Sequence, residues 1–214
     1  MPLPTFFNLP DEKRQRILEC AIEEFAQHDF DSASISQIVA RAGIAKGSLY
    51  QYFTDKDDLY RYLIDLASQK KSQMLAGAQP PDPGMNIFDT LRWLFREMAN
   101  FELRYPGLAR IGYRALYGKS PLPEGVMEKG RQSTMQYFTR LIEQGKQRGE
   151  VRAEVDAEAA AFIFTAALTE LGSFLASQPG QITGRIGSEE DPATLTRVQE
   201  KYDQMIAILQ HGMA

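Results

Sequence analysis

Apolar residues recur along this chain at the three- to four-residue spacing of amphipathic α-helices. The first apolar stripe, within residues 11–28, is formed by Ile17, Leu18, Ala21, Ile22 and Phe25. Glu19, Glu23 and Glu24 lie mostly off this stripe. Further helices are predicted over residues 55–76, 86–104, 108–117, 124–147, 157–177 and 191–211, with proline- and glycine-rich breaks at 77–84, 106–107, 118–123 and 179–188. Because no segment alternates with the two-residue period of a strand, the sequence predicts an all-α fold.

Residues 34–59 have the layout of two short helices joined by a glycine-centred turn and followed by a longer helix. Ser34 and Gln37 have the spacing of a capping box at the start of the first short helix. Gly43 follows this helix at a point where glycine adopts the left-handed conformation at little cost. The second short helix is expected at about residues 45–51. This layout is that of a helix-turn-helix, whose second helix lies in the major groove of DNA.

The second short helix carries residue types that suit close contact with DNA. Its small residues allow close approach to bases, its lysine and serine offer hydrogen bonds, and two tyrosine hydroxyls can bond phosphates. The helical phase predicts that both tyrosines are exposed, whereas Leu49 points into the core. The residues expected to face DNA are Lys46, Gly47, Ser48, Tyr50 and Tyr52.

Two lysines lie near predicted helix starts, where the helix dipole disfavours a cation by about 0.3–1 kcal/mol. Lys46 begins the second short helix, and Lys56 follows Thr54 or Asp55, the expected cap of the next helix. A cation kept at such a place indicates an anionic partner such as phosphate. The alternative is that both lysines are solvated surface residues. Ser34, at the start of the first short helix, is a further expected phosphate contact.

This segment resembles the N-terminal DNA-binding domain of the TetR family of bacterial transcriptional regulators. The family has a run of the form Ile-Ala-x-x-x-Gly-(Val/Ile)-x-x-(Gly/Ala)-(Ser/Thr)-(Leu/Ile)-Tyr-x-(Tyr/His)-Phe-x-x-Lys-x-x-Leu, and the similar run here extends from Ile38 to Leu59. The resemblance spans about residues 11–60 and implies, position by position, the DNA contacts named above. Ala45 departs from the pattern, because the family often has a capping Ser or Thr there. Such a cap is worth about 1 kcal/mol.

Composition is ordinary for a globular protein and leaves the partner open. Of 214 residues, 43% are hydrophobic and 24% charged. No apolar run approaches the roughly 18 residues of a membrane span, and the N-terminus lacks a secretion signal. With one cysteine, Cys20, these features predict a cytoplasmic protein that does not enter a membrane. The net charge of −4, with six basic and ten acidic residues in residues 1–60, does not by itself indicate nucleic acid.

No group of residues predicts catalysis, a cofactor or a metal site. The Gly-Lys-Ser sequence at residues 118–120 ends like a phosphate-binding loop, but its spacing from Gly112 is wrong and no strand precedes it. His28 and His211 are isolated from further ligands. Cys20 lies one helical step from the first apolar stripe and is expected to be a packed thiol. The sequence therefore favours a protein that is not an enzyme.

The resemblance further implies two domains. Residues 1–60 form the helix-turn-helix DNA-binding domain, and residues 61–214 form a helical regulatory domain with a ligand pocket and a dimer interface. Large aromatic and methionine side chains are concentrated in residues 93–138, where they suit an adaptable apolar site, although such residues at helical spacing more often form an ordinary core. The candidate pocket residues are Trp93, Met98, Phe101, Glu102, Tyr105, Tyr113, Tyr117, Met135 and Phe138.

The predicted helix at 157–177 is apolar over more than one face and needs cover on several sides. With 191–211 it is expected to form a four-helix interface with a second copy, and burial within one chain is the competing interpretation. The sequence thus predicts a homodimeric regulator, a repressor by family habit. An apolar or aromatic small-molecule effector would release it from a palindromic double-stranded DNA operator. A helical protein–protein adaptor or a ligand carrier without DNA readout is the alternative.

Overall fold

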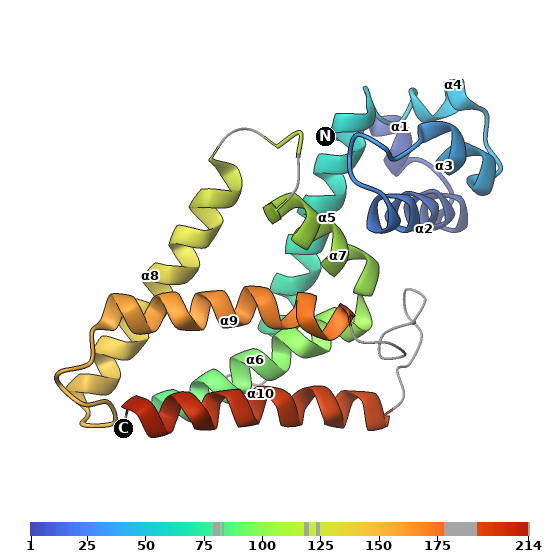
Figure 1. Ribbon diagram of the computed structural model, residues 1–214. Helices are drawn as coiled ribbons and strands as arrows, with labels where there is room; N and C mark the ends of the chain where they lie inside the picture. Colours follow the sequence, from blue (N-terminus) through green and yellow to red (C-terminus); the bar gives the residue numbers. More distant parts are fainter. Residues whose placement is uncertain (79–81, 83, 118–119, 123–124, 178–191, 214) are drawn as a thin grey trace. The chain divides into compact units, whose positions relative to one another are not determined.

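The computed structural model describes residues 1–78, 82, 84–117, 120–122, 125–177 and 192–213. All regular elements in these ranges are α-helices, which confirms the all-α prediction. None of the described helices combines the length and the apolar character that crossing a bilayer requires. The helices are α1 Pro4–Phe7, α2 Asp11–Gln27, α3 Ile35–Ala42, α4 Lys46–Leu49, α5 Lys56–Gly77, α6 Ile87–Arg104, α7 Pro106–Tyr117, α8 Val126–Gln147, α9 Ala157–Ser177 and α10 Pro192–Met213 (Figure 1).

Three local differences from the sequence-based prediction have clear causes. The short helix α1 was not predicted, because four residues are too few for an apolar period. The break predicted at residues 106–107 lies at Tyr105 instead, since Pro106 is the first residue of α7, where its missing N–H costs nothing. Helix α4 spans Lys46–Leu49 and is therefore shorter than the helix predicted at about residues 45–51. The predicted break at 179–188 lies outside the described residues, as do parts of those at 77–84 and 118–123.

The chain forms two compact units. We call residues 1–70 and 105–124 the N-terminal unit, and residues 71–104 and 125–214 the C-terminal unit. Helix α5 therefore begins in one unit and ends in the other, and the chain passes between them again where α6 leads into α7. The unit that contains the predicted helix-turn-helix thus also includes α7, which follows the expected domain boundary at residue 60.

Helices α2, α3 and α5 of the N-terminal unit meet around a core of aliphatic and aromatic side chains. Ile17 of α2, Ile38 of α3 and Leu59 of α5 are fully buried. The short helix α1 adds Phe6, whose ring centroid lies 4.8 Å from that of Phe53. This aromatic contact fixes the segment between α4 and α5 against the N-terminal residues.

Helix α7 packs on α2 in the N-terminal unit. Its Arg114 guanidinium donates to the carbonyl oxygens of Ala26 and Gln27, each at 3.2 Å, and pairs with Asp29. A cation that binds the last carbonyl groups of a helix satisfies acceptors that have no partner within the helix. Arg114 therefore caps the C-terminal end of α2 and anchors α7 to it.

The C-terminal unit pairs α8 with α9 and α6 with α10 (Figure 1). Its core contains side chains of all four helices, and one close contact brings α8 against the start of α6. A Cβ added to Gly145 would lie 2.5 Å from Ile87 Cγ2, so glycine is required at this crossing. The fully or almost fully buried core residues include Phe95, Phe138, Ile142, Ala161, Phe164, Tyr202 and Ile206.

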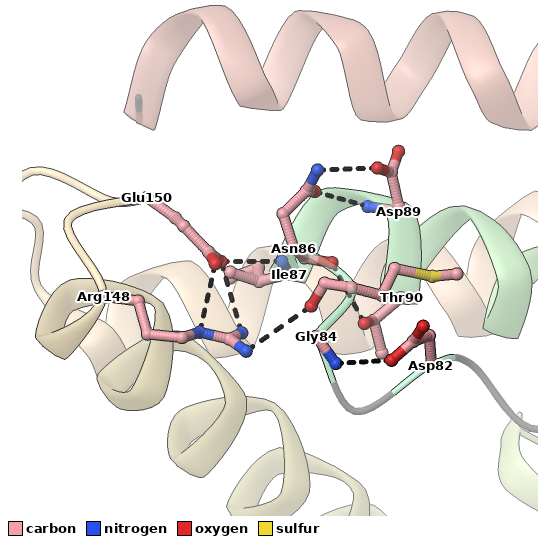
Figure 2. Close-up of polar contacts among 9 residues, drawn as sticks. Asp82, Gly84, Asn86, Ile87, Asp89, Thr90, Arg148 and Glu150 are labelled. Carbon is pink, nitrogen blue, oxygen red and sulfur yellow. Dashed lines mark hydrogen bonds and ion pairs between the residues drawn. The ribbon is translucent and has the colours of Figure 1, made fainter.

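A polar network joins the start of α6 to the connection between α8 and α9. Figure 2 shows Glu150 next to the first turn of α6, where its Oε2 accepts from Ile87 N at 2.8 Å and pairs with Arg148. Asn86 caps the helix, since its Oδ1 accepts from Asp89 N at 2.9 Å and its amide donates to the Asp89 carboxylate at 2.6 Å. The N–H groups that begin α6 are thereby satisfied within the C-terminal unit.

The contact of α7 with α2 predicts opposite effects for two glycines of α7. A Cβ at Gly107 would lie 2.5 Å from Ile22 Cγ2, whereas a Cβ at Gly112 would meet nothing within 4 Å. Gly107→Ala is expected to lower the free energy of unfolding by about 1–3 kcal/mol through overpacking. Gly112→Ala is expected to leave it unchanged or raise it by up to about 1 kcal/mol through helix propensity. Urea unfolding measures both, and equal effects would contradict the close packing of α7 on α2.

Candidate nucleic-acid interface

A buried carboxylate of α2 holds both ends of α3. Glu24 is 4% exposed, and its Oε1 accepts from the backbone N–H of Ser34 at 2.8 Å, at the start of α3. Its Oε2 pairs with the Arg41 guanidinium in the last turn of α3. One side chain therefore fixes the position of α3 on α2.

The predicted capping box at Ser34 is only half formed. Ser34 Oγ accepts from Gln37 N at 3.4 Å, as expected. The backbone N–H of Ser34, which the Gln37 side chain would accept in a full box, is bound by Glu24 instead. The placement of Glu24 mostly off the apolar stripe was wrong. Glu24 follows Ile17 by seven residues and Ala21 by three, which is the spacing of the buried face.

The turn after α3 has the predicted geometry. Gly43 has φ +69°, in the left-handed region, and Ile44 N donates to the carbonyl of Val39 at 3.0 Å. The chain then enters α4, whose N-cap residue Ala45 makes no side-chain hydrogen bond, as its methyl group requires. Leu49, 1% exposed, anchors α4 in the core, as predicted. Helix α4 is thus a single turn that packs on the core through Leu49.

The outer side of α4 is exposed. Lys46 and Gly47 lie on the surface, Ser48 is half-buried, and the Tyr50 side chain is 45% exposed. A Cβ at Gly47 would meet nothing within 4 Å, so the fold of this chain does not require glycine there. A surface glycine that packing does not require suits the close approach of a partner. Ser34, also half-buried, begins the neighbouring helix α3.

The predicted exposure of Tyr52 is wrong. Its side chain is 6% exposed, and its ring centroid lies 6.2 Å from that of Phe6 in α1. The Tyr52 carbonyl also accepts from Leu3 N at 2.8 Å. Because α1 was not predicted, nothing in the local helical phase indicated this cover.

Lys56 has a partner within the fold. Its Nζ donates to the carbonyl of Asp31 at 3.3 Å and lies 4.7 Å from the centroid of the Phe30 ring. The fold therefore supplies partners for Lys56, and its contact with phosphate stays a prediction. The start of α5 is capped by Asp55, whose Oδ1 accepts from Asp58 N at 2.7 Å, which selects Asp55 over Thr54 as the cap.

Acidic side chains are absent from the exposed part of this motif. Residues 32–54 contain Arg41 and Lys46 and no aspartate or glutamate. Several acids of the N-terminal unit outside this segment bind groups of their own chain: Asp11 binds Arg14, Glu24 binds Arg41, Asp29 binds Arg114, Asp55 caps α5, and Asp58 accepts from Thr54 N and pairs with the N-terminal amine. The negative net charge of residues 1–60 is therefore displaced from α3 and α4.

Comparison with known proteins identifies the family of this chain. Residues 17–63 match the family profile described as "Bacterial regulatory proteins, tetR family", and residues 85–214 match "Tetracyclin repressor-like, C-terminal domain". A crystal structure of a TetR family transcriptional regulator from Chloroflexus aurantiacus J-10-FL is 41% identical, with a TM-score of 0.84, covering 100% of this chain and 98% of that one. The chain belongs to the TetR family of bacterial regulatory proteins. The resemblance stated from the 38–59 run is confirmed.

Two curated relatives of this TetR-family chain carry names that describe regulators. The HTH-type transcriptional repressor SCO4008 of Streptomyces coelicolor is 28% identical over 159 residues, which are 73% of this chain and 77% of that protein. The A-factor receptor protein of Streptomyces griseus is 27% identical over 156 residues, which are 72% of this chain and 51% of that protein.

The candidate pocket residues fall in both units. Tyr105, Tyr113 and Tyr117 belong to the N-terminal unit, whereas the other candidates belong to the C-terminal unit. Phe138 is fully buried in the core against Phe164, which supports the alternative interpretation as a core residue. The Tyr117 side chain lies outside the described residues. The remaining candidates are Met98, Phe101 and Glu102, which are buried on α6, and Trp93 and Met135, which are half-buried.

The role of Glu24 predicts unequal effects for two neighbouring acids. Glu24→Gln keeps the shape of the side chain but removes the charge that pairs with Arg41, and it is expected to lower the free energy of unfolding by about 1–3 kcal/mol. Glu23 lies 3.6 Å from Arg41 with its side chain 49% exposed, so Glu23→Gln is expected to cost less than about 0.5 kcal/mol. Urea denaturation followed by circular dichroism compares them. An equal loss of unfolding free energy in the two variants would show that the buried Glu24 carboxylate stabilises the fold no more than the exposed Glu23 does.

Proposed function

We propose that this TetR-family chain is a sequence-specific transcriptional repressor that binds a palindromic operator as a homodimer and leaves it when a small-molecule effector binds. The observation that carries the DNA-binding part is the acid-free segment 32–54, which presents the exposed turn of α4. The names of two relatives, a transcriptional repressor and a receptor protein, support the regulatory part. A chain with this role acts on DNA in the cytoplasm, by binding rather than by catalysis.

In this proposal, α4 enters the major groove and reads base edges. Lys46 and Ser48 donate hydrogen bonds to bases, and Gly47 lets the backbone approach them closely. The hydroxyls of Tyr50 and Ser34 bind phosphates on either side. We leave Tyr52 and Lys56 out of the contact set, because the first is covered by α1 and the second is bound to the 30–31 segment.

Removal of a single charge on α4 tests the DNA-binding part. Lys46→Ala is expected to weaken binding to a duplex that the unaltered protein recovers from a random pool, by about tenfold near physiological salt. Tyr50→Phe, which removes only the hydroxyl, is expected to lose less. Fluorescence anisotropy with labelled duplex measures all three proteins.

Lys129→Ala is the matched control, since Lys129 is an exposed lysine of α8 and the change in charge is identical. Its affinity for the duplex is expected to equal that of the unaltered protein. An equal loss at Lys46 and Lys129 would contradict specific contact by α4 and leave only bulk electrostatic attraction. Recovery of no preferred duplex from the pool would favour the adaptor or carrier alternative.

The proposed dimer interface lies on α9 and α10. Phe162 and Ile163 of α9 are 56% and 46% exposed, and Ile208 of α10 is 72% exposed. Exposed large apolar side chains grouped on a helix face indicate a protein partner. A second copy of the chain is the partner that a palindromic operator requires, because a two-fold axis matches the symmetry of the DNA to that of the protein.

A charge placed on this face is expected to separate the protomers. Phe162→Glu would bury a carboxylate in the interface, so the dissociation constant of the dimer is expected to rise at least about tenfold. Val126→Glu is the control, because Val126 is 43% exposed but lies on α8. Sedimentation equilibrium distinguishes the two variants. A dimer that tolerates Phe162→Glu as well as Val126→Glu would place the interface elsewhere.

The proposed effector is an apolar or aromatic small molecule bound in the C-terminal unit, where Met98 and Phe101 of α6 are buried. The signal has three covalent routes to the N-terminal unit: along α5, through the junction of α6 with α7, and through the chain between residues 124 and 125. Within the N-terminal unit, α7 is anchored to α2 by Arg114, and α2 holds α3 through Glu24. A coupling free energy of about 1–3 kcal/mol between effector and operator is sufficient for a switch.

A further inference from the structure

Two hydroxyl groups are buried in the C-terminal unit without a hydrogen-bond partner. Tyr202 of α10 is 1% exposed, and its ring meets that of Phe95 edge to face with centroids 5.4 Å apart. Thr165 of α9 is 5% exposed. Within the part of the chain that the structure describes, Tyr202 Oη and Thr165 Oγ1 are the buried side-chain oxygens without a partner.

The Thr165 hydroxyl has no hydrogen-bond partner, whereas the hydroxyls of several other helical threonines do. A helical threonine normally donates its hydroxyl to the carbonyl three or four residues earlier. The threonines that do so, at 2.8–3.1 Å, are Thr90, Thr134, Thr139 and Thr169. A buried hydroxyl without a partner destabilises a fold, so these two groups indicate a partner that the chain itself does not supply.

A buried carboxylate lies near Tyr202. Burial raises the pKa of Tyr202, and the negative charge of Glu102 raises it further, which places the Glu102 carboxylate near the phenol. Glu102 is 8% exposed, and its charge also acts on Lys71 of α5. Lys71 is exposed as a residue, but its Nζ lies 5.0 Å from the centroid of the Phe101 ring.

Helix α6 contacts both α9 and α10, so the two hydroxyls lie on helices that share α6 as a neighbour. The side chains around them are almost entirely apolar. Phe95 and Ala99 of α6, Phe164 of α9 and Ile206 of α10 belong to the same core cluster as Tyr202. A molecule that reached these hydroxyls would bury apolar surface while gaining directed hydrogen bonds.

We propose that α6, α9 and α10 take a neutral, largely apolar molecule whose polar atoms hydrogen-bond to Tyr202 Oη and Thr165 Oγ1. This inference rests on the proposed function and names the chemical class of the effector. Phenol and alcohol hydroxyls each donate and accept, so an amide, ester, lactone or alcohol group satisfies them.

The surroundings of Tyr202 favour a neutral ligand over an ionised one. An anionic ligand would meet the negative charge of Glu102, which acts on the Tyr202 phenol. An ion of either sign would also lose its hydration among the apolar side chains of this core. A neutral polar group avoids both costs.

The first test asks whether the hydroxyls lack partners. Thr165→Val and Tyr202→Phe keep the shape of each side chain and remove the oxygen, so each is expected to raise the thermal midpoint of the free dimer by about 2–4 °C. Thr169→Val is the control, since it breaks the bond to Thr165 O and is expected to lower the midpoint or leave it unchanged. A lower midpoint for Tyr202→Phe and Thr165→Val would show that both oxygens are already satisfied and would overturn the proposal.

The second test compares octanamide, octanoate and octylammonium, which share one alkyl chain and differ in charge. Octanamide is expected to raise the thermal midpoint and to change the fluorescence of the single tryptophan, Trp93, more than either ion does at equal concentration. Tyr202→Phe is expected to weaken octanamide binding about tenfold. Stronger binding of either ion, equal binding by the variant, or no binding of any of the three overturns the proposal.

Operator affinity separates this inference from the proposed function. Without ligand, Tyr202→Phe and Thr165→Val are expected to bind the selected duplex as the unaltered protein does, because both residues lie in the C-terminal unit. If the protein binds the duplex but the octanamide results differ from those expected, only the proposed effector class is refuted. A protein that binds no duplex refutes the proposed function.

Discussion

The surface proposed to face DNA depends on one buried carboxylate. Glu24 accepts from the first N–H of the α3 segment and pairs with Arg41 in its last turn, so it determines how α3 lies on α2. Helix α4 has only four residues and is too short to hold its own position. Its orientation therefore follows from α3 through the Gly43 turn and from Leu49 in the core. If Glu24 shifted, every proposed DNA contact on α4 would shift with it.

The same interaction explains how an acidic protein presents a surface suited to DNA. Several acids of the N-terminal unit bind groups of their own chain, as partners of Arg14, Arg41 and Arg114 and as the cap of α5. Segment 32–54 has none, so none of its own side chains would repel phosphate, while Lys46 supplies a cation on α4. Net charge over a domain says little about such a surface, because the position of each charge decides the local potential.

Local signals in the sequence predicted most of the helices, the Gly43 turn, the buried Leu49 and the cap at the start of α5. These features depend on neighbours within a few residues. The features that were missed depend on contacts far apart along the chain. Examples are the cover of Tyr52 by α1, the bond of Lys56 to Asp31, and the anchoring of α7 to α2 by Arg114. Glu24 is an exception among the missed features, because its spacing of seven residues from Ile17 is a local signal that places it on the buried face.

Hydrogen exchange of the protein with and without its selected duplex tests the central claim most directly. The account predicts that bound DNA slows amide exchange most in residues 43–51 and at the start of α3, with little change on the α8 surface around Lys129. Slowed exchange confined to α8, α9 or α10, with residues 43–51 unaffected, would contradict it and show that nucleic acid meets this chain on another surface.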